Sequence, residues 1–249
     1  MHNDPLLPPP PAKDPRHIAL FLDVDGTLLS FAQTPDAVHV DDGLRTLLAD
    51  LEHRCDGALA LVSGRSIASI DSLFDPLTLC VAGSHGLEIR DRQAFRRLGE
   101  ALPEDTLAAL RSLRDRAKGS LLEEKQFGAA LHYRRSPELG SILADAVRDL
   151  HTPINDRFQL IEGDHVLELS ASNANKGSAI AAFCDRQPWR DRQPVFVGDD
   201  TTDEAGFDAV NARGGLAIRV GSRPRSAARF QLDNVAAVKA WLRTLVIAS

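Results

Sequence analysis

The feature that most constrains the fold of this chain is an apolar run that ends in two closely spaced aspartates. Residues 18–22 are all apolar, and Asp23-Val24-Asp25-Gly26-Thr27 follow at once. An uninterrupted apolar run of this length predicts a strand buried on both faces, as in the middle of a parallel sheet. Because ligands bind outside the carboxyl ends of such strands, we expect Asp23 and Asp25 at a functional edge of the sheet.

This acidic segment has two other possible interpretations. An Asp-x-Asp-Gly-Thr segment also occurs as a simple acidic turn, and the spacing alone leaves that alternative open. The spacing argues against an EF-hand calcium loop. Counted from Asp23, it requires Gly where Leu28 stands and Glu where Thr34 stands.

Apolar runs alternate with helical periodicities over most of the chain, and this alternation predicts the fold class. A β-α-β-α-β rhythm is typical of a Rossmann-like, doubly wound parallel sheet in an α/β protein. The predicted strands of this core are 18–22, 58–62, 77–83, 194–198 and 216–220, and its predicted helices are 40–53, 66–74, 176–184, 202–211 and 236–246.

The rhythm changes near Pro103, which predicts an inserted smaller α/β cap domain. Its pattern is α-β-β-α-β-β, which favours a small sheet with helices on one face. The predicted helices are 103–116 and 137–150, and the predicted strands are 121–125, 129–133, 158–162 and 166–169. We place the cap domain at 102–171, the catalytic core at 16–101 and 172–249, and a disordered proline-rich tail at 1–15.

Composition narrows the classes of partner. A net charge of −6 and 5% aromatic residues argue against nucleic-acid binding, which leaves a basic footprint. No apolar run approaches the length that spans a bilayer, so we expect no membrane partner. The cysteines Cys55, Cys80 and Cys184 are odd in number and far apart, as in a reducing compartment. We therefore expect a cytoplasmic protein with a small-molecule substrate, and, without a dimer pattern, a monomer.

Polar residues follow several of the predicted strands, or open a helix, at the same edge of the sheet. Ser63 follows the second predicted strand, and Lys176 begins a predicted helix. Asp199 directly follows the predicted strand 194–198 and belongs to the acidic segment 198–203. Carboxylates gathered there repel one another unless a cation neutralises them. Oxygen ligands without His or Cys favour a hard ion, so the sequence predicts Mg²⁺ as cofactor.

Each of these residues also has a structural alternative. The Asp199 segment can be an acidic helix N-terminus capped by Asp200 or Thr202. Lys176 can be a solvated surface lysine, and Ser63 can be a cap or turn residue. The expected convergence on one sheet edge favours the functional interpretation for all of them.

The chain contains an Asp-x-Asp-Gly-Thr motif at 23–27, then Ser63, then Lys176, and then a Gly-Asp-Asp-x-x-Asp motif at 198–203. In this order, the four motifs resemble the haloacid dehalogenase (HAD) superfamily. The resemblance implies that Asp23 attacks phosphorus to form an aspartyl phosphate, and that Asp25 protonates the leaving oxygen and later activates water. A sugar alkoxide leaves poorly without an acid whereas a halide needs none, so Asp25 favours phosphoryl transfer. Ser63 and Lys176 would contact phosphoryl oxygens. Asp23, the Asp25 carbonyl and Asp199 would ligate Mg²⁺, with Asp200 and Asp203 orienting them.

Within this superfamily, residues 56–65, 82–88, 130–134 and 198–204 are similar to the bacterial trehalose-6-phosphate phosphatases. This resemblance covers nearly the whole chain after the proline-rich segment, and it implies hydrolysis of trehalose 6-phosphate to trehalose and phosphate. By motif position, the substrate-binding residues would be Gly64, Arg65 and His85 on the core and Lys125, His132, Arg134 and Glu168 on the cap.

The cap positions also have alternatives. His132 can be a core-facing strand residue and Lys125 a solvated one, whereas alternation predicts that Glu168 faces solvent or the site. The chain departs from the family at Asp164, where Lys is common, and at Ser170-Ala171, where a basic residue and Pro are common. A phosphatase or phosphomutase for another sugar phosphate, or a catalytically silent sugar-phosphate-binding module, remain alternative functions.

Overall fold

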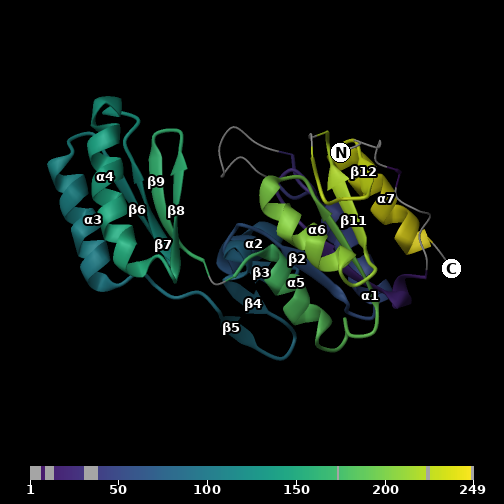
Figure 1. Cartoon of the computed structure of the whole chain (residues 1–249). Helices are drawn as coiled ribbons and strands as arrows, with labels where there is room; N and C mark the ends of the chain where they lie inside the picture. Colours follow the sequence, from purple (N-terminus) through teal and green to yellow (C-terminus); the bar gives the residue numbers. More distant parts are fainter. Residues whose placement is uncertain (1–6, 9–13, 31–38, 173, 223–224, 248–249) are drawn as a thin grey trace. The chain divides into compact units, whose positions relative to one another are not determined.

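The structure is a computed structural model that describes residues 7–8, 14–30, 39–172, 174–222 and 225–247. The chain divides into two compact units (Figure 1). The first comprises residues 1–96 together with 175–249, and the second comprises residues 97–174. The second unit is slightly longer than the predicted insert at 102–171, because the segments that connect it to the core are grouped with it. Each unit is described separately below.

The first unit contains an eight-stranded sheet in the order β12-β11-β10-β1-β2-β3-β4-β5. The six strands from β12 to β3 are parallel, and β4 runs antiparallel to β3. This parallel-dominated sheet confirms the predicted fold class. The strands are β1 (Ile18–Leu22), β2 (Leu59–Val62), β3 (Cys80–Gly83), β4 (Glu88–Arg90), β5 (Phe95–Arg97), β10 (Gln193–Gly198), β11 (Leu216–Val220) and β12 (Phe230–Leu232).

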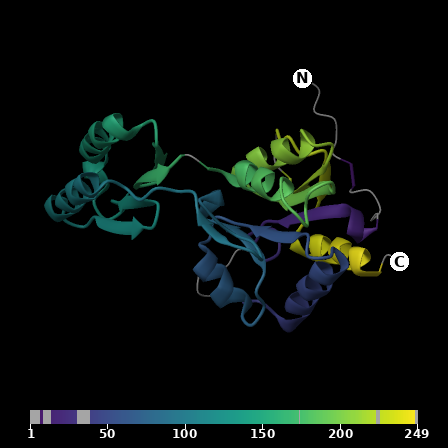
Figure 2. The same ribbon diagram turned by 90° about the horizontal axis from the view of Figure 1, so that it is seen from below.

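Helices cover both faces of this sheet, as Figure 2 shows. On one face lie α1 (Asp42–Arg54), α2 (Ile67–Phe74) and α7 (Val235–Ile247), and on the other lie α5 (Lys176–Cys184) and α6 (Glu204–Asn211). All five residues of β1 are buried, as its uninterrupted apolar run predicts. Its Phe21 ring packs against Phe183 of α5, with ring centroids 5.9 Å apart. The packed sheet is therefore a rigid support for the side chains on the loops that follow its strands.

Side-chain caps fix the starts of the helices that matter for the site. Ser66 accepts a hydrogen bond from the Ser69 amide, so α2 begins at Ile67. Asn175 and Ser178 form a reciprocal capping box, which begins α5 at Lys176. The capping box therefore decides where the lysine enters the helix.

The second unit is a four-stranded antiparallel sheet in the order β6-β7-β9-β8, with α3 and α4 packed on one face (Figure 1). Its element order is the predicted α-β-β-α-β-β. Leu167 and Leu169 of β9 are buried, and the Glu168 side chain between them alternates to the opposite face. The elements are α3 (Glu104–Arg116), β6 (Leu121–Lys125), β7 (Gly128–His132), α4 (Gly140–His151), β8 (Phe158–Gly163) and β9 (Val166–Ala171).

The structure adds features that the sequence patterns did not predict. The strands β4, β5 and β12 are new, and each has three residues. Within the segment predicted to be a disordered tail, Leu7 accepts a hydrogen bond from the Gln231 amide and donates one to the Arg229 carbonyl. Leu7 thus extends the sheet beside β12. Residues 1–6 and 9–13 of that segment lie outside the described residues.

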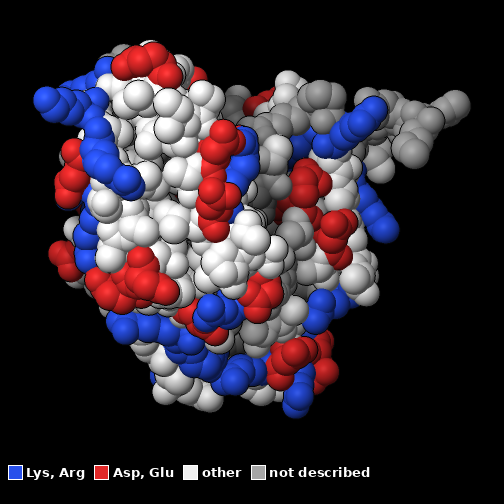
Figure 3. Space-filling model, turned by 60° about the vertical axis from the view of Figure 1, so that its left-hand side comes forward, with Lys and Arg blue, Asp and Glu red and all other residues white. Residues whose placement is uncertain are grey.

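The described surface and helices bear on the expected partners. In the part of the chain that the structure describes, no helix is both long and apolar enough to cross a membrane. On the face drawn in Figure 3, described lysine and arginine side chains alternate with aspartate and glutamate. The expected absence of a nucleic-acid partner and the expected monomer stay predictions.

Candidate active site

Three neighbouring parallel strands bring the predicted residues to one edge of the core sheet. Asp23 directly follows β1, Ser63 follows β2 and Asp199 follows β10. The Asp23 amide donates to the Val197 carbonyl at 2.9 Å, which continues the ladder between β1 and β10. The carboxyl ends of parallel strands form the usual ligand-binding edge of an open α/β sheet.

Four charged side chains meet at this edge and form what we call the acidic cluster: Asp23, Lys176, Asp199 and Asp203. Ligand atoms of the three aspartates all lie within 4.8 Å of one another. The Lys176 ammonium lies 2.7 Å from Asp23 Oδ1 and 2.6 Å from Asp203 Oδ1. Only 3% of Lys176 is exposed. The alternative of a solvated surface lysine is therefore wrong.

Asp203 ties the cluster to its own loop. Its Oδ1 accepts from Lys176, and its Oδ2 accepts from the backbone amides of Asp199 at 2.9 Å and Asp200 at 2.8 Å. Both oxygens of this fully buried carboxylate thus accept hydrogen bonds within the protein. This geometry suits a residue that orients Asp199 and Lys176.

Asp200, the residue after Asp199, caps the turn that follows. The Asp200 carboxylate accepts from the Thr201 amide at 2.7 Å and caps the short 3₁₀ turn η6 (Thr201–Asp203), after which α6 continues. This contact matches the capping alternative for Asp200. The predicted helix 202–211 is therefore a 3₁₀ turn followed by an α-helix.

Burial makes the acidic cluster costly in the absence of a cation. Burial, together with the nearby Asp203, raises the pKa of Asp23 well above its ordinary value, although Lys176 opposes this rise. Burial and Asp203 also raise the pKa of Asp199. Burial alone would lower the pKa of Lys176, but Asp23 and Asp203 outweigh burial and raise it. The three carboxylates, when ionised, carry two more negative charges than the single lysine offsets.

The donor atoms fit a hard divalent cation. Asp23 and Asp199 supply carboxylate oxygens from two neighbouring strand ends, and no His or Cys belongs to the group. Carboxylate and carbonyl oxygens are the ligands that Mg²⁺ prefers. A cation beside Asp23 and Asp199 would supply the positive charge that the cluster lacks.

The acidic segment after β1 requires glycine at position 26. Its φ is +80°, and a Cβ at this position would collide with the Asp199 carboxylate. The Thr27 hydroxyl also donates to Asp199 Oδ1, at 3.4 Å. Sequence reasoning assigned no role to Gly26 or Thr27, although their place directly after Asp25 was the available signal.

Asp25 lies outside the acidic cluster and pairs with Arg65. The Arg65 guanidinium donates from Nε to Asp25 Oδ2 at 2.7 Å and from Nη2 to Oδ1 at 2.8 Å. The hydrogen bond to Asp25 raises the pKa of Arg65. The Ser63 hydroxyl is buried and accepts from the Arg65 amide at 3.1 Å. Ser63 is therefore not the cap of α2, because Ser66 fills that place.

A left-handed turn carries His85 beside these residues. Ser84, His85 and Gly86 have φ values of +50°, +58° and +98°, an uncommon backbone for non-glycine residues. The His85 ring packs against Gly64, where an added Cβ would lie 2.6 Å from His85 Cε1. The buried Glu88 holds the turn, since its Oε1 accepts from the Ser84 hydroxyl at 3.1 Å. Sequence reasoning missed Glu88.

The predicted residues of the cap form ion pairs within the second unit. Lys125 on β6 lies 2.9 Å from Glu168 on β9. His132 on β7 lies 3.1 Å from Glu123 on β6. Register places Glu123 and Glu168 on the same sheet face, opposite the helices. Glu123 was missed, although it stands two residues before Lys125, which is the strand period for a shared face.

Arg134 and Asp164 form a further pair in the second unit, 3.1 Å apart and mostly exposed. Asp164 is one of the positions where the chain departs from the family pattern. Its carboxylate therefore offsets the charge of Arg134. Of the other departures, Ser170 pairs in register with Gly128 and Gln159, and Ala171 is buried at the end of β9.

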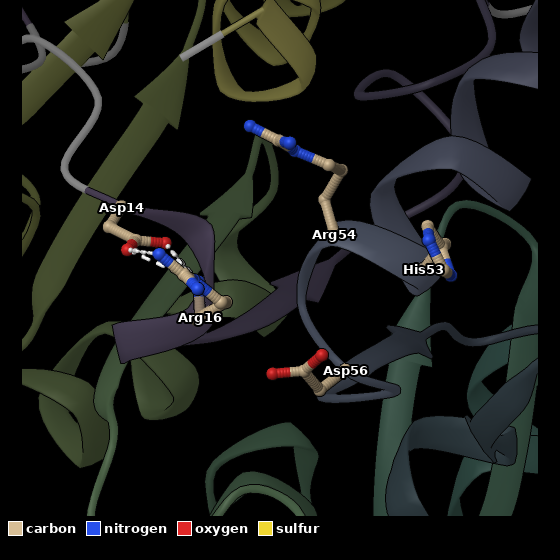
Figure 4. A pocket seen from close by; sticks show the side chains of 5 residues that line it. All are labelled: Asp14, Arg16, His53, Arg54 and Asp56. Atoms are coloured by element: carbon tan, nitrogen blue, oxygen red, sulfur yellow. Dashed lines mark hydrogen bonds and ion pairs between the residues drawn. The ribbon is translucent and has the colours of Figure 1, made fainter. Parts of the chain in front are cut away.

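A separate hollow of about 260 Å³ lies near the amino ends of β1 and β2 (Figure 4). It is lined by Asp14, Arg16, His53, Arg54 and Asp56. Asp14 and Arg16 are already paired with each other at 2.6 Å. The hollow contains none of the predicted site residues, and it lies at the strand ends remote from the acidic cluster.

Comparison with known proteins identifies the family. The sequence model of the trehalose-phosphatase family matches residues 21–236. This chain belongs to that family. The match covers both units and includes Asp23, Lys176 and Asp199. It confirms the resemblance to the trehalose phosphatases, and the chain is accordingly a phosphatase.

Individual relatives agree with the family assignment. The chain is 37% identical over 233 residues to a trehalose-6-phosphate phosphatase of Escherichia coli, covering 92% of this chain and 87% of the relative. It is 38% identical over 236 residues to a probable trehalose-phosphate phosphatase of Sinorhizobium fredii, covering 92% and 88%. Among solved structures, a trehalose-6-phosphate phosphatase of Aspergillus fumigatus aligns with a TM-score of 0.71 and 25% identity, covering 94% of each chain.

Proposed function

We propose that this protein is a magnesium-dependent phosphomonoesterase that hydrolyses trehalose 6-phosphate to trehalose and phosphate. The observation that carries the proposal is the acidic cluster, in which Asp23 and Asp199 approach each other beside Lys176. Membership of the trehalose-phosphatase family and the names of the bacterial relatives support the choice of substrate.

In the proposed reaction, Asp23 is the nucleophile. A carboxylate oxygen of Asp23 forms a bond to phosphorus, and the bond between phosphorus and the sugar oxygen breaks. Asp25 donates a proton to the departing oxygen. Water then attacks the aspartyl phosphate, Asp25 accepts a proton from that water, and Asp23 is restored as inorganic phosphate leaves.

Lys176 and Ser63 support this reaction. Lys176 fixes Asp23 through the hydrogen bond to Oδ1 and places positive charge next to the reacting carboxylate. Positive charge preorganised in a buried site stabilises charge that develops on phosphoryl oxygens. Ser63, at the end of the neighbouring strand β2, is a hydroxyl donor for the same oxygens.

Asp23, Asp199 and the Asp25 carbonyl are the groups that we propose to hold Mg²⁺. When bound, the ion would neutralise charge on the phosphoryl group and orient it for in-line displacement. Asp203 would keep Asp199 in place through the two backbone amides that it accepts.

The cap would recognise the sugar. The sheet face that carries Lys125, His132 and Glu168 also carries Glu123, and it offers several donors and acceptors to sugar hydroxyls. On the core, His85 is held against Gly64, next to Ser63. The Arg134–Asp164 pair reduces positive charge on the cap. This pair is the observation that favours a different sugar phosphate as the second candidate substrate.

Phosphate release from a panel of sugar phosphates tests the proposal. The wild-type protein with Mg²⁺ is expected to act best on trehalose 6-phosphate, and a chelator or Asp23→Asn should abolish release. Better activity on another sugar phosphate would replace the substrate. If the wild-type protein releases no more phosphate than Asp23→Asn from any compound, the protein is a catalytically silent binding module.

We also propose a reducing compartment, the cytoplasm, as the location of the protein. The three cysteines are free thiols in the structure, and two of them are buried. Unpaired thiols are usual in reducing compartments.

A further inference from the structure

The Arg65 side chain pairs with Asp25, the residue that transfers protons in the proposed function. Two parallel N–H···O bonds join them, at 2.7 and 2.8 Å, so both Asp25 oxygens are engaged by one planar group. A bidentate fork of this kind fixes direction as well as distance. The pair is shielded, with side-chain exposures of 18% for Arg65 and 32% for Asp25.

The backbone of Arg65 is itself held on both sides. Its amide donates to the Ser63 hydroxyl at 3.1 Å, and its carbonyl accepts from the Ser84 amide at 2.8 Å. Ser84 belongs to the left-handed turn that Glu88 clamps, and the other contact of Glu88 Oε1, at 2.7 Å, is the amide of Ile67. The backbone of Arg65 is therefore held in place, and its side chain points toward Asp25.

We propose that Arg65 is a positioning residue that acts through Asp25, and not a group that binds the sugar phosphate directly. The inference rests on the proposed function, in which Asp25 moves the proton. General acid–base catalysis requires the carboxyl group within hydrogen-bond reach of the reacting oxygen. A displacement of about 1 Å can cost about 100-fold in rate. The two hydrogen bonds from the Arg65 guanidinium restrict displacement of the Asp25 carboxyl group.

The choice of leaving group separates this role from a structural one. A sugar alkoxide needs a proton to leave, whereas p-nitrophenolate does not. The leaving group affects only the first step, formation of the aspartyl phosphate, so that step is followed as release of trehalose or p-nitrophenolate in a single turnover. Arg65→Met should lower the rate of this step by about 100-fold for trehalose 6-phosphate and by less than about threefold for p-nitrophenyl phosphate, with the KM for each substrate nearly unchanged. Asp25→Asn should show the same contrast between the two substrates.

A double-mutant cycle then tests whether Arg65 acts through Asp25. Arg65→Met in the Asp25→Asn background is expected to cause no further loss on either substrate. Arg65→Lys, which keeps the charge but lacks the fork, should recover only part of the rate. If Arg65→Met unfolds the protein, the contrast between substrates is measured on Arg65→Lys instead.

Arg90 is the matched control, because it forms a similar bidentate pair with Asp71, at 2.6 and 2.7 Å, between β4 and α2. Arg90→Met should leave the ratio of the two activities at its wild-type value. The proposal is overturned if Arg65→Met raises KM on both substrates, or if its loss adds to that of Asp25→Asn. Should trehalose 6-phosphate fail as substrate for the wild type, the proposed function fails, and the cycle is run with whichever sugar phosphate is hydrolysed.

Discussion

The Lys176 ammonium lies 2.7 Å from Asp23 Oδ1, although the two residues are 153 positions apart in the chain. Both side chains are almost completely buried, and a second carboxylate, Asp203, takes the other contact of the lysine. The pair joins the end of β1 to the start of α5. Four measurements test this arrangement and the other residues of the proposed site.

Replacement of Lys176 by Met should destabilise the fold. It leaves the carboxylates of Asp23 and Asp203 buried without their cation, at a cost of about 3 kcal/mol in the free energy of unfolding. Chemical denaturation measures this change. Lys239, whose pair with Asp41 is 3.7 Å long and lies at the surface, is the control. Lys239→Met should cost less than about 1 kcal/mol, and equal losses for both variants would contradict the argument.

Stabilisation by Mg²⁺ should grow with pH. The pKa values of Asp23 and Asp199 are raised by burial and by Asp203. Without a cation, their contribution to stability is therefore present at low pH and is lost as pH rises through the raised values. A cation needs both carboxylates charged, so the rise in Tm on adding Mg²⁺ should be larger near about pH 8 than near about pH 5. An equal rise at both pH values, or an undiminished rise in Asp199→Asn, would count against this metal site.

Gly26→Ala should damage catalysis more than stability. The new Cβ meets the Asp199 carboxylate, so we expect weaker Mg²⁺ binding and a loss of about 100-fold in phosphate release. Gly214 is a matched control, because it has a φ of +67° but open space around a new Cβ. Gly214→Ala should show only the left-handed backbone cost, about 1–2 kcal/mol in unfolding. Similar activities of the two variants would remove the role assigned to Gly26.

Glu168→Gln should weaken recognition of the sugar. A charged acceptor on the exposed sheet face of the cap is lost, and we expect KM for trehalose 6-phosphate to rise about tenfold, with little change for p-nitrophenyl phosphate. Steady-state kinetics on both substrates measures this difference. Glu162, paired with Arg148 of α4 at 2.8 Å, is the control. If Glu162→Gln raises KM equally, Glu168 has no special part in binding.

The long elements of the fold were predictable because their patterns are strong. The apolar run of β1 and the apolar periodicity of α1 each extend over enough residues to distinguish strand from helix. The three-residue strands β4, β5 and β12 carry no readable period. They form because a neighbouring strand or Leu7 offers backbone partners, which is information from the folded chain.

The candidate site divides in the same way. The meeting of Asp23 and Asp199 was predictable, since the ends of neighbouring parallel strands share an edge. The pairing of Arg65 with Asp25 was not, because it depends on hydrogen bonds of Arg65 to Ser63 and to Ser84. The roles of Gly26 and Glu88 likewise appear only once the backbone is closed around them.

The position of β1 between β2 and β10 has a consequence for biosynthesis. A nascent chain emerging from the ribosome can offer β2 as the first neighbour of β1, whereas β10 is translated only after the whole of 97–174. Until then β1 has one unpaired edge, and neither Lys176 nor Asp199 exists to meet Asp23. A truncated translation product that stops within the insert therefore carries Asp23 without Lys176, Asp199 or Asp203, the other members of the acidic cluster.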